Sequence, residues 1–272
     1  MSAVFSPMGI CPDRKAEEVT DMKKKKPGFF YPLITILVAI AVWEAVTRIF
    51  SIPSYILPGP VEVAAALGKD FSLILYHAAS TLAEGTIGIA ISIGISILIA
   101  IWMDHFPLAK KTVYPLLVIS QTVPVMAIAP LLIIWFGFGM APKILLVIIM
   151  CFFPITVNLT DGFSQVDPEA LAMFRVWKAS GWQIYRHLKF PFALPYFFSG
   201  LRISVTWMLV AAILSEWLGG DRGIGVYMLR AKQAYALDQV FASVVFVVLV
   251  SLLLIGILTL IRNRCIHWNR TE

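Results

Sequence analysis

The stretch Gln165–Pro195, QVDPEALAMFRVWKASGWQIYRHLKFPFALP, decides how this chain is organised. It is polar and basic, and it separates two runs that are apolar enough to cross a membrane. Connections between packed elements usually need only a few residues. We expect a connection of this length, with helix signals of its own, to contact something in the water phase.

The composition is that of an integral membrane protein. The chain has 272 residues, of which 59% are hydrophobic and 14% charged, and its mean hydropathy is +0.84. A soluble domain carries about 25% charged residues. The three cysteines, Cys11, Cys151 and Cys265, show no CxxC spacing, so neither a disulfide framework nor a metal site is expected.

Six runs have the length that a spanning helix needs, which is roughly 20 apolar residues. They are continuously apolar rather than alternating, which favours helices over a barrel. The prediction is therefore an all-α integral membrane protein with six transmembrane helices and a long connection, 161–198, between the fourth and fifth. The predicted spans are Phe29–Thr47, Ala78–Met103, Thr112–Phe136, Lys143–Thr160, Ser199–Leu218 and Val240–Ile261.

The third run is unusual because it contains Pro115, Pro124 and Pro130. Each proline removes a backbone donor and tends to kink a helix. A bent span either lines a cavity or is a tolerated kink in a packed bundle, and the sequence leaves both interpretations open.

The distribution of basic residues predicts the orientation of the chain. Of the 22 Lys and Arg residues, 16 fall in the two tails, the second connection and the long fourth connection, if Arg202 just inside the next span is counted with the last. Because Lys and Arg accumulate in cytoplasmic segments, both termini and the long connection are predicted to be cytoplasmic. The net charge of +6 is then mainly a topology signal, and no nucleic-acid partner is expected.

The natural chain could start at Met1 or at Met22. Residues 1–21 are polar, and Met22 precedes Lys23–Lys26 and the first span. The basic and apolar order resembles a signal peptide, but the apolar run is too long and no small-residue cleavage site follows it. We expect a cytoplasmic tail over 1–28, a six-span domain over 29–262 and a second tail over 263–272.

Two short helices are predicted in the long connection. Asp167, Pro168 and Glu169 form a strong helix start, and Gly181 is a plausible stop about 13 residues on. A second helix, Trp182–Lys189, is expected to end at Pro191 and Pro195. An apolar stripe at helical spacing runs along the first helix through Ala170, Met173, Phe174 and Trp177.

Such a stripe outside the membrane must be covered. The lipid headgroup layer and a groove on a partner protein are both suitable covers, and the spacing alone does not choose between them.

Several motifs follow one another between about Tyr55 and Ala242. They are Ile56-Leu57-Pro58-Gly59-Pro60, Gln121-Thr122-Val123-Pro124, Ile134-Trp135-Phe136-Gly137, Ser180-Gly181-Trp182-Gln183-Ile184, Phe190-Pro191-Phe192-Ala193-Leu194-Pro195, Ser215-Glu216-Trp217-Leu218-Gly219-Gly220 and Gly223-Ile224-Gly225. In their order and spacing they resemble the membrane subunit of binding-protein-dependent ABC importers, in the branch that serves alkanesulfonates, taurine, nitrate and thiamine precursors.

The resemblance implies that the long connection carries a coupling helix, which docks on an ATPase subunit and transmits its motion. The family's Glu-Ala-Ala…Gly…Leu-Pro signature, anchored on Pro191, places its acidic residue at Ala172 and its glycine at Lys178, so the chain departs from it at both positions. Glu169 lies one turn earlier and is a candidate substitute. The implied coupling residues are Glu169, Ala170, Met173, Phe174, Trp177, Lys178, Gly181 and Pro191.

The resemblance also implies the other subunits of the transporter. Two permease subunits, with a second copy of this chain as the expected partner, would enclose one pathway in a bacterial inner membrane. Two ABC ATPase subunits would bind the cofactor ATP, and an extracytoplasmic binding protein would deliver a small organic solute, either sulfonate-like or a thiamine-type pyrimidine. This chain shows no GxxxxGK[ST] motif, and its cluster 219–225 is interpreted as a flexible external turn rather than a phosphate loop.

The polar residues inside the spans admit further readings. Glu44, Glu84 and Glu216 are predicted near the external ends, as a polar gate or as ordinary packing. An ion-coupled transporter or channel is the main alternative function and would need charges at mid-membrane; a membrane enzyme would need clustered His, Asp or Ser. The candidate pathway residues are Pro124, Pro130, Trp207 and Glu216.

Overall fold

The computed structural model describes residues 30–266, and these form helices and connecting turns without a strand. Five of the helices are long and apolar enough to cross a membrane, or six if one bent pair counts as a single span. The predicted all-α membrane class is confirmed. The predicted tail over 1–28, the alternative start at Met22, Cys11 and most of the segment 263–272 lie outside the described residues.

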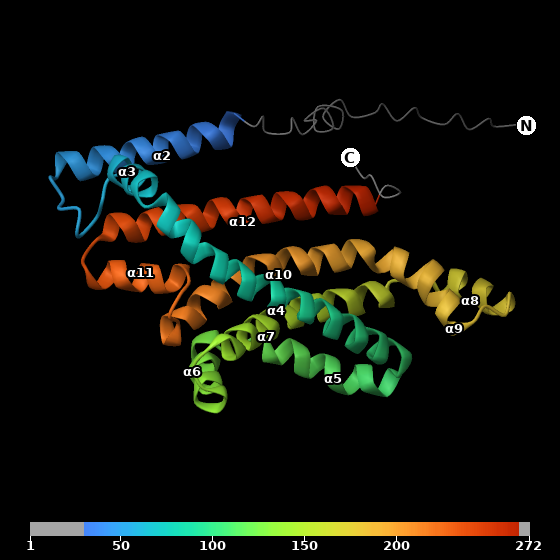
Figure 1. Ribbon diagram of the computed structural model, residues 1–272. Coiled ribbons are helices and arrows are strands. Elements are labelled where there is room, and N and C mark those ends of the chain that lie inside the picture. Colours follow the sequence, from blue (N-terminus) through green and yellow to red (C-terminus); the bar gives the residue numbers. More distant parts are fainter. Residues whose placement is uncertain (1–29, 267–272) are drawn as a thin grey trace, which may run out of the picture. The chain divides into compact units, whose positions relative to one another are not determined.

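The chain divides into two compact units, Met1–Ser51 and Ile52–Glu272. The described part of the first unit is one helix, α2 (Phe30–Ile49), drawn in blue in Figure 1. Within it Arg48 donates to Glu44, four residues earlier, at 2.5 Å. Glu44 therefore has an ordinary partner one helical turn away, as expected for a carboxylate near a helix end.

The second unit holds the remaining helices. Four of its five predicted spans are single helices that extend beyond the predicted bounds, the third is divided, and α3 and α11 were not predicted. The helices are α3 (Pro60–Lys69), α4 (Phe71–His105), α5 (Pro107–Ser120), α6 (Val125–Phe136), α7 (Met140–Ser164), α8 (Pro168–Val176), α9 (Gly181–Ile184), α10 (Phe190–Gly219), α11 (Ile224–Gln233) and α12 (Leu237–Cys265), with a π-helical segment, η1 (Tyr185–Lys189), between α9 and α10.

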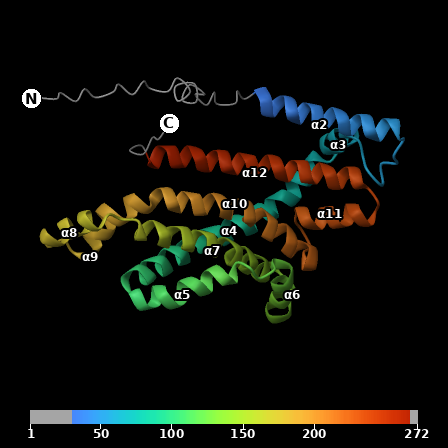
Figure 2. The same ribbon diagram turned by 180° about the vertical axis from the view of Figure 1, so that it is seen from behind.

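The core of the second unit forms where α7 packs against α4 and α10. Buried side chains from α7, among them Leu146 and Cys151, meet Met208 and Ala212 of α10. Figures 1 and 2 show α8 and α9 beyond one end of α7 and α10, whereas α11 lies at the opposite end of α10. The segment that was predicted to face the water phase is therefore separated from α11 by the length of the bundle.

Small residues bring these helix backbones close together. Ser92 and Ser96 of α4 donate to the backbone carbonyls of Ile148 and Phe152 on α7, each at 3.1 Å. The Ser92 hydroxyl also lies 2.8 Å from the carbonyl of Gly88 in its own helix. Interhelical hydroxyl bonds and close backbone approach are the usual means by which membrane helices associate.

The third predicted span is divided rather than kinked. Helices α5 and α6 meet at 99°, with the break between Ser120 and Val125. Pro124 precedes the first residue of α6 with an extended backbone, ψ 123°. Because proline has no N–H to donate and the residue before it avoids the helical region, a helix stops before this position and a new one starts after it. Pro115 and Pro130 lie inside helices and do not break them.

Candidate functional site

Helix α8 begins where the sequence predicts. The Asp167 carboxylate accepts a hydrogen bond from the backbone N–H of Glu169 at 2.9 Å, and Pro168 occupies the first turn. The helix is shorter than predicted, because it ends at Val176 and the backbone of Lys178 turns to a φ of +53°. A left-handed residue terminates a helix and favours glycine, which is the residue that the resemblance implies at this position.

The apolar residues of α8 divide into an inner and an outer set. Ala170 and Phe174 are half-buried, although the Phe174 ring still contacts the Trp177 ring at 6.0 Å between centroids. Met173 and Trp177 are 46% and 68% exposed. Val176 and Trp182, which the predicted stripe and coupling set leave out, are 78% and 65% exposed and belong to the outer set. We call the exposed set Met173, Val176, Trp177 and Trp182 the α8 patch.

Gly181 starts a helix rather than ending one. Ser180 is the N-cap of α9: its hydroxyl accepts from the Gln183 backbone N–H at 3.3 Å, and the Gln183 side chain accepts from the Ser180 N–H at 2.7 Å. This reciprocal capping box is a standard helix start. The glycine signal was misread because a serine–glycine pair is compatible with either helix terminus, and the glutamine three residues on decides between them.

Pro191 and Pro195 do not end the second helix, which continues into α10. The π-helical segment η1 makes this possible, because the Phe190 N–H bonds to the Tyr185 carbonyl, five residues back, instead of four. A π turn shifts the hydrogen-bond register of a helix. The missing donor of Pro191 then falls in the first turn of α10, where the resulting gap is tolerated.

The η1 segment is tied to the end of α4. The Asp104 carboxylate accepts from Lys189 Nζ and from the Tyr185 hydroxyl, each at 2.5 Å. The Lys189 and Asp104 side chains are only 14% and 11% exposed, so this ion pair is largely shielded from water. Nearby, the Tyr114 hydroxyl on α5 donates to Asp161 on α7 at 2.8 Å. The polar connection is therefore bonded to the spans through side chains, not only through the backbone.

A cavity lies at the break between α5 and α6. It has a volume of about 330 Å³ and is bounded by the connecting residues Gln121–Pro124, by Met150 and Phe153 of α7 and by Trp207 of α10. Of the candidate pathway residues, Pro124 and Trp207 line this cavity. Pro130 does not line it, since it lies one and a half turns further along α6.

Glu216, the last candidate pathway residue, lies away from this cavity and is engaged in packing. It is 1% exposed and accepts from the Thr81 hydroxyl at 2.7 Å and from the Gly225 backbone N–H at 2.6 Å. The Thr81 hydroxyl also accepts from the Ile224 N–H at 2.9 Å. Glu216 therefore fastens the start of α11 to α4 and α10, and the packing interpretation describes it better than a gate.

The glycine cluster 219–225 is correspondingly not a flexible turn. The N–H of Gly223 donates to His77 Nδ1 at 3.2 Å, and Gly223 has a φ of +138°. A side chain at Gly225 would come within 2.4 Å of the Ile213 carbonyl oxygen. The glycines are needed because the backbone approaches its neighbours closely and adopts a conformation that other residues avoid. Sequence alone shows such a cluster but not the contacts.

Glu84 is paired in the same region. Its carboxylate accepts from Lys143 Nζ of α7 at 2.9 Å, and both side chains are below 10% exposed. Lys143 is near the start of α7, so the pair lies towards the end of the bundle that holds α11. No group of three or more His, Cys, Asp or Glu side chains within residues 30–266 is arranged to hold a metal ion.

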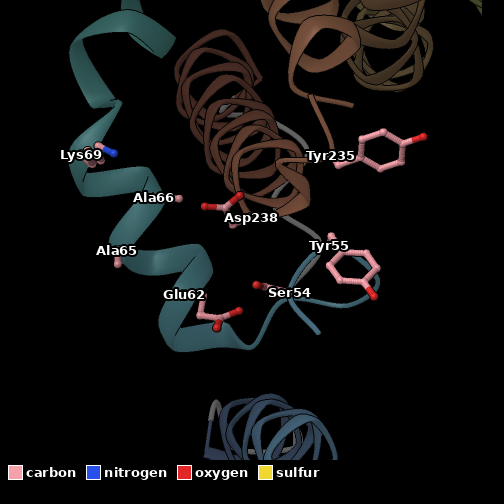
Figure 3. Close-up of a pocket in the computed structure, with 8 residues that line it drawn as sticks. All are labelled: Ser54, Tyr55, Glu62, Ala65, Ala66, Lys69, Tyr235 and Asp238. Carbon is pink, nitrogen blue, oxygen red and sulfur yellow. The ribbon is translucent and has the colours of Figure 1, made fainter. Parts of the chain in front are cut away.

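A second cavity, of about 390 Å³, lies at the α11 end (Figure 3). Glu62 of α3 and Asp238 of α12 come from different helices, and Tyr55 and Tyr235 are 58% and 76% exposed at its edge. Close by, the Tyr227 hydroxyl donates to Asp70 at 3.0 Å; burial and this carboxylate raise the pKa of Tyr227, so the phenol keeps its proton. No sequence pattern indicates this cavity, because the residues that line it are distant along the chain.

Comparison with known proteins agrees with this architecture. The family described as "Binding-protein-dependent transport system inner membrane component" matches residues 92–267. The formylaminopyrimidine transport permease protein ThiX of Halalkalibacterium halodurans is 33% identical over 242 residues, covering 89% of this chain and 96% of its own. The putative aliphatic sulfonates transport permease protein SsuC of Bacillus subtilis is 26% identical over 267 residues, covering 97% and 96%.

Among solved structures, an amino acid ABC transporter superposes with a TM-score of 0.59 at 16% identity, over 74% of this chain and 97% of that one. This likeness shows a shared fold. The chain therefore belongs to the family of binding-protein-dependent transport system inner membrane components, and it is the multi-pass permease subunit of an ABC importer.

Proposed function

We propose that the importer is driven through the α8 patch, which docks in a groove on the ATPase subunit. The observation that carries this proposal is the exposure of Val176 and Trp177, at 78% and 68%, on a capped helix that lies outside the spans. Large apolar side chains that are exposed together in a soluble region mark an interaction site. The eight residues of the predicted coupling set lie in or beside this segment, and Val176 and Trp182 are added to them.

The α8 patch could be covered by lipid headgroups or by a partner protein, and the hydrogen bonds of η1 favour the partner protein. A helix that only rests on lipid needs no fixed link to a span, whereas force transmission needs one. Lys189 and Tyr185, just beyond α9, are both bonded to Asp104 of α4. Displacement of α8 and α9 would therefore act on α4 as well as on α10, which continues directly from η1.

The remaining parts of the proposal follow from the family and the charge distribution. Two copies of this chain enclose the pathway, and both termini and α8 face the cytoplasm, where 16 of the 22 Lys and Arg residues are predicted. ATP binds to the ATPase subunits, since the chain has no phosphate-loop motif. The extracytoplasmic binding protein delivers a small organic solute; named relatives serve a formylaminopyrimidine and aliphatic sulfonates.

The test is ATP-driven uptake in proteoliposomes that contain this chain, its ATPase subunit and its binding protein. Trp177→Asp places a carboxylate in the α8 patch and should abolish uptake, while membrane insertion and size-exclusion behaviour stay native. Arg175→Asp is the matched control, because it adds the same carboxylate at an exposed position of α8 outside the patch. Native uptake by Trp177→Asp would reject the proposal, and so would solute movement without the ATPase subunit.

A further inference from the structure

We propose that the cavity at the α5–α6 break is a solute-selecting site for an uncharged, planar heteroaromatic compound rather than an anion such as a sulfonate. This inference rests on the proposed function and specifies its substrate class. It starts from the chemistry of the cavity wall, which combines aromatic and aliphatic side chains with a few uncharged polar ones.

The described residues that line the cavity include no Asp, Glu, Lys, Arg or His. Trp207 and Phe153 supply ring faces, and Met150 supplies a polarisable thioether. Ser120, Gln121 and Thr122 are consecutive lining residues with uncharged polar groups. The hydroxyls of Ser120 and Thr122 donate to the carbonyls of Leu117 and Ile119, so they can serve the cavity as acceptors, whereas the Gln121 amide can both donate and accept. A mostly apolar wall with a few polar groups at one position is typical of a small-molecule site, in which the polar groups set the orientation of the ligand.

An anion would find no counter-charge here. Moving a sulfonate from water to a site of low dielectric constant is strongly unfavourable unless a cation or several donors replace its hydration. The nearest basic residue along α10, Arg202, is exposed and does not line the cavity. An uncharged ring with polar substituents loses much less hydration, and its faces can stack on an aromatic side chain.

The two helix termini that flank the break, the end of α5 and the start of α6, support the same conclusion. The carboxyl end of α5 carries a partial negative charge and the amino end of α6 a partial positive charge. These ends are separated only by residues 121–124, so both lie beside the cavity. Together they present both acceptors and donors, which suits a heteroaromatic compound that carries both ring nitrogens and amino or hydroxyl groups.

The volume sets an upper limit on the solute. About 330 Å³ is at the lower end of the range for ligand pockets, which is roughly 300–1,000 Å³. This volume accommodates one small ring system with short substituents. A ligand that stacks on Trp207 would contact α10, and through α10 it would be connected to η1 and the α8 patch.

The experiment measures equilibrium binding to the full chain in lipid nanodiscs at pH 8. The probe is tritiated 4-amino-2-methylpyrimidine, and methanesulfonate is the competitor. We expect one saturable site that methanesulfonate does not displace. Trp207→Leu should weaken binding of the pyrimidine about tenfold, because an aromatic stack is lost. Gln121→Leu, at an exposed polar position, should weaken it as well.

Trp102→Leu is the matched control. Trp102 is 43% exposed on α4, close to the 41% of Trp207, but it does not line the cavity. The Trp102→Leu protein should bind the pyrimidine with the affinity of the unaltered chain, and all three variants should keep the native melting temperature.

Displacement by methanesulfonate, absence of a saturable site, or native affinity in both Trp207→Leu and Gln121→Leu would overturn the inference. None of these outcomes affects the ATP-driven uptake test of the proposed function, so the two can fail separately.

Discussion

Gly200→Ala should destabilise the protein by displacing α10 from α7. A Cβ atom at this position would lie 2.7 Å from the Pro154 carbonyl oxygen, 3.0 Å from Asn158 Cβ and 3.1 Å from Ile155 Cα. Ordinary contacts of a Cβ atom are 3.4–4 Å. Two of the three atoms are backbone, so no side-chain rotation can relieve the contact, and the helices must separate by several tenths of an ångström.

The magnitude follows from two opposing effects. Alanine is favoured over glycine inside a helix by about 0.8–1.0 kcal/mol. Overpacking a close interface costs about 1–3 kcal/mol, and contact with rigid backbone belongs at the upper end of that range. The expected net loss is about 2 kcal/mol in the free energy of unfolding. Separation of α7 and α10 would also strain the Ser204–Cys151 hydrogen bond, which is now 2.9 Å long.

Gly94→Ala is the matched control in the same bundle. No atom lies within 4 Å of a Cβ added at Gly94. This substitution should therefore gain up to about 1 kcal/mol from helix propensity alone. Unfolding in mixed micelles of mild detergent and sodium dodecyl sulfate measures both variants. A Gly200→Ala protein as stable as Gly94→Ala would refute the packing argument.

Three further predictions concern the connection and the buried charges. Lys178→Gly should raise the free energy of unfolding by about 1 kcal/mol, since a left-handed conformation costs roughly that much in any other residue; thermal unfolding that shows no gain over Lys178→Ala would contradict it. Asp104→Asn should lower uptake while ATP hydrolysis continues, because Lys189 loses its charged partner; a proportional fall in both rates would argue against a role in transmission. Glu84→Gln or Lys143→Met alone should lower the free energy of unfolding by about 3–5 kcal/mol, because each leaves the other charge buried and unpaired. The double variant should lose clearly less, and a double-mutant cycle measures the difference.

The spans and their helical class could be predicted because each span is a local property of the chain, whereas the short helices α3 and α11 were missed. A run of apolar residues suffices to identify a spanning helix, and Asp167 and Pro168 suffice to mark the start of α8. The break at Pro124 was visible only as a proline, since a kink and a 99° turn have the same sequence signal. Whether Gly181 ended or began a helix depended on the reciprocal bonds of Ser180 and Gln183.

The functional contacts were harder to predict because they join residues that are distant in sequence. Asp104 and Lys189 are separated by 85 residues, and Thr81 and Glu216 by 135. Helical spacing selected Met173 and Trp177, which are exposed, but it could not show that Phe174 is half-buried while Val176 is the most exposed large hydrophobic residue of α8. Exposure depends on what packs against a helix, and the period of one helix does not reveal its neighbours.

The continuity of the segment 181–219 links the two proposed sites. Pro191 and Pro195 would be expected to break this segment, yet the π turn of η1 lets α9 and α10 run on as one helical stretch of 39 residues. Trp182 of the α8 patch and Trp207 of the cavity lie on this same stretch, about 37 Å apart at a rise of 1.5 Å per residue. A continuous helix transmits displacement along its axis, whereas a flexible loop would absorb it. If η1 were flexible rather than held by Asp104, movement of the ATPase subunit would stop at Pro191; because it is held, that movement can reach the residue that we infer contacts the solute.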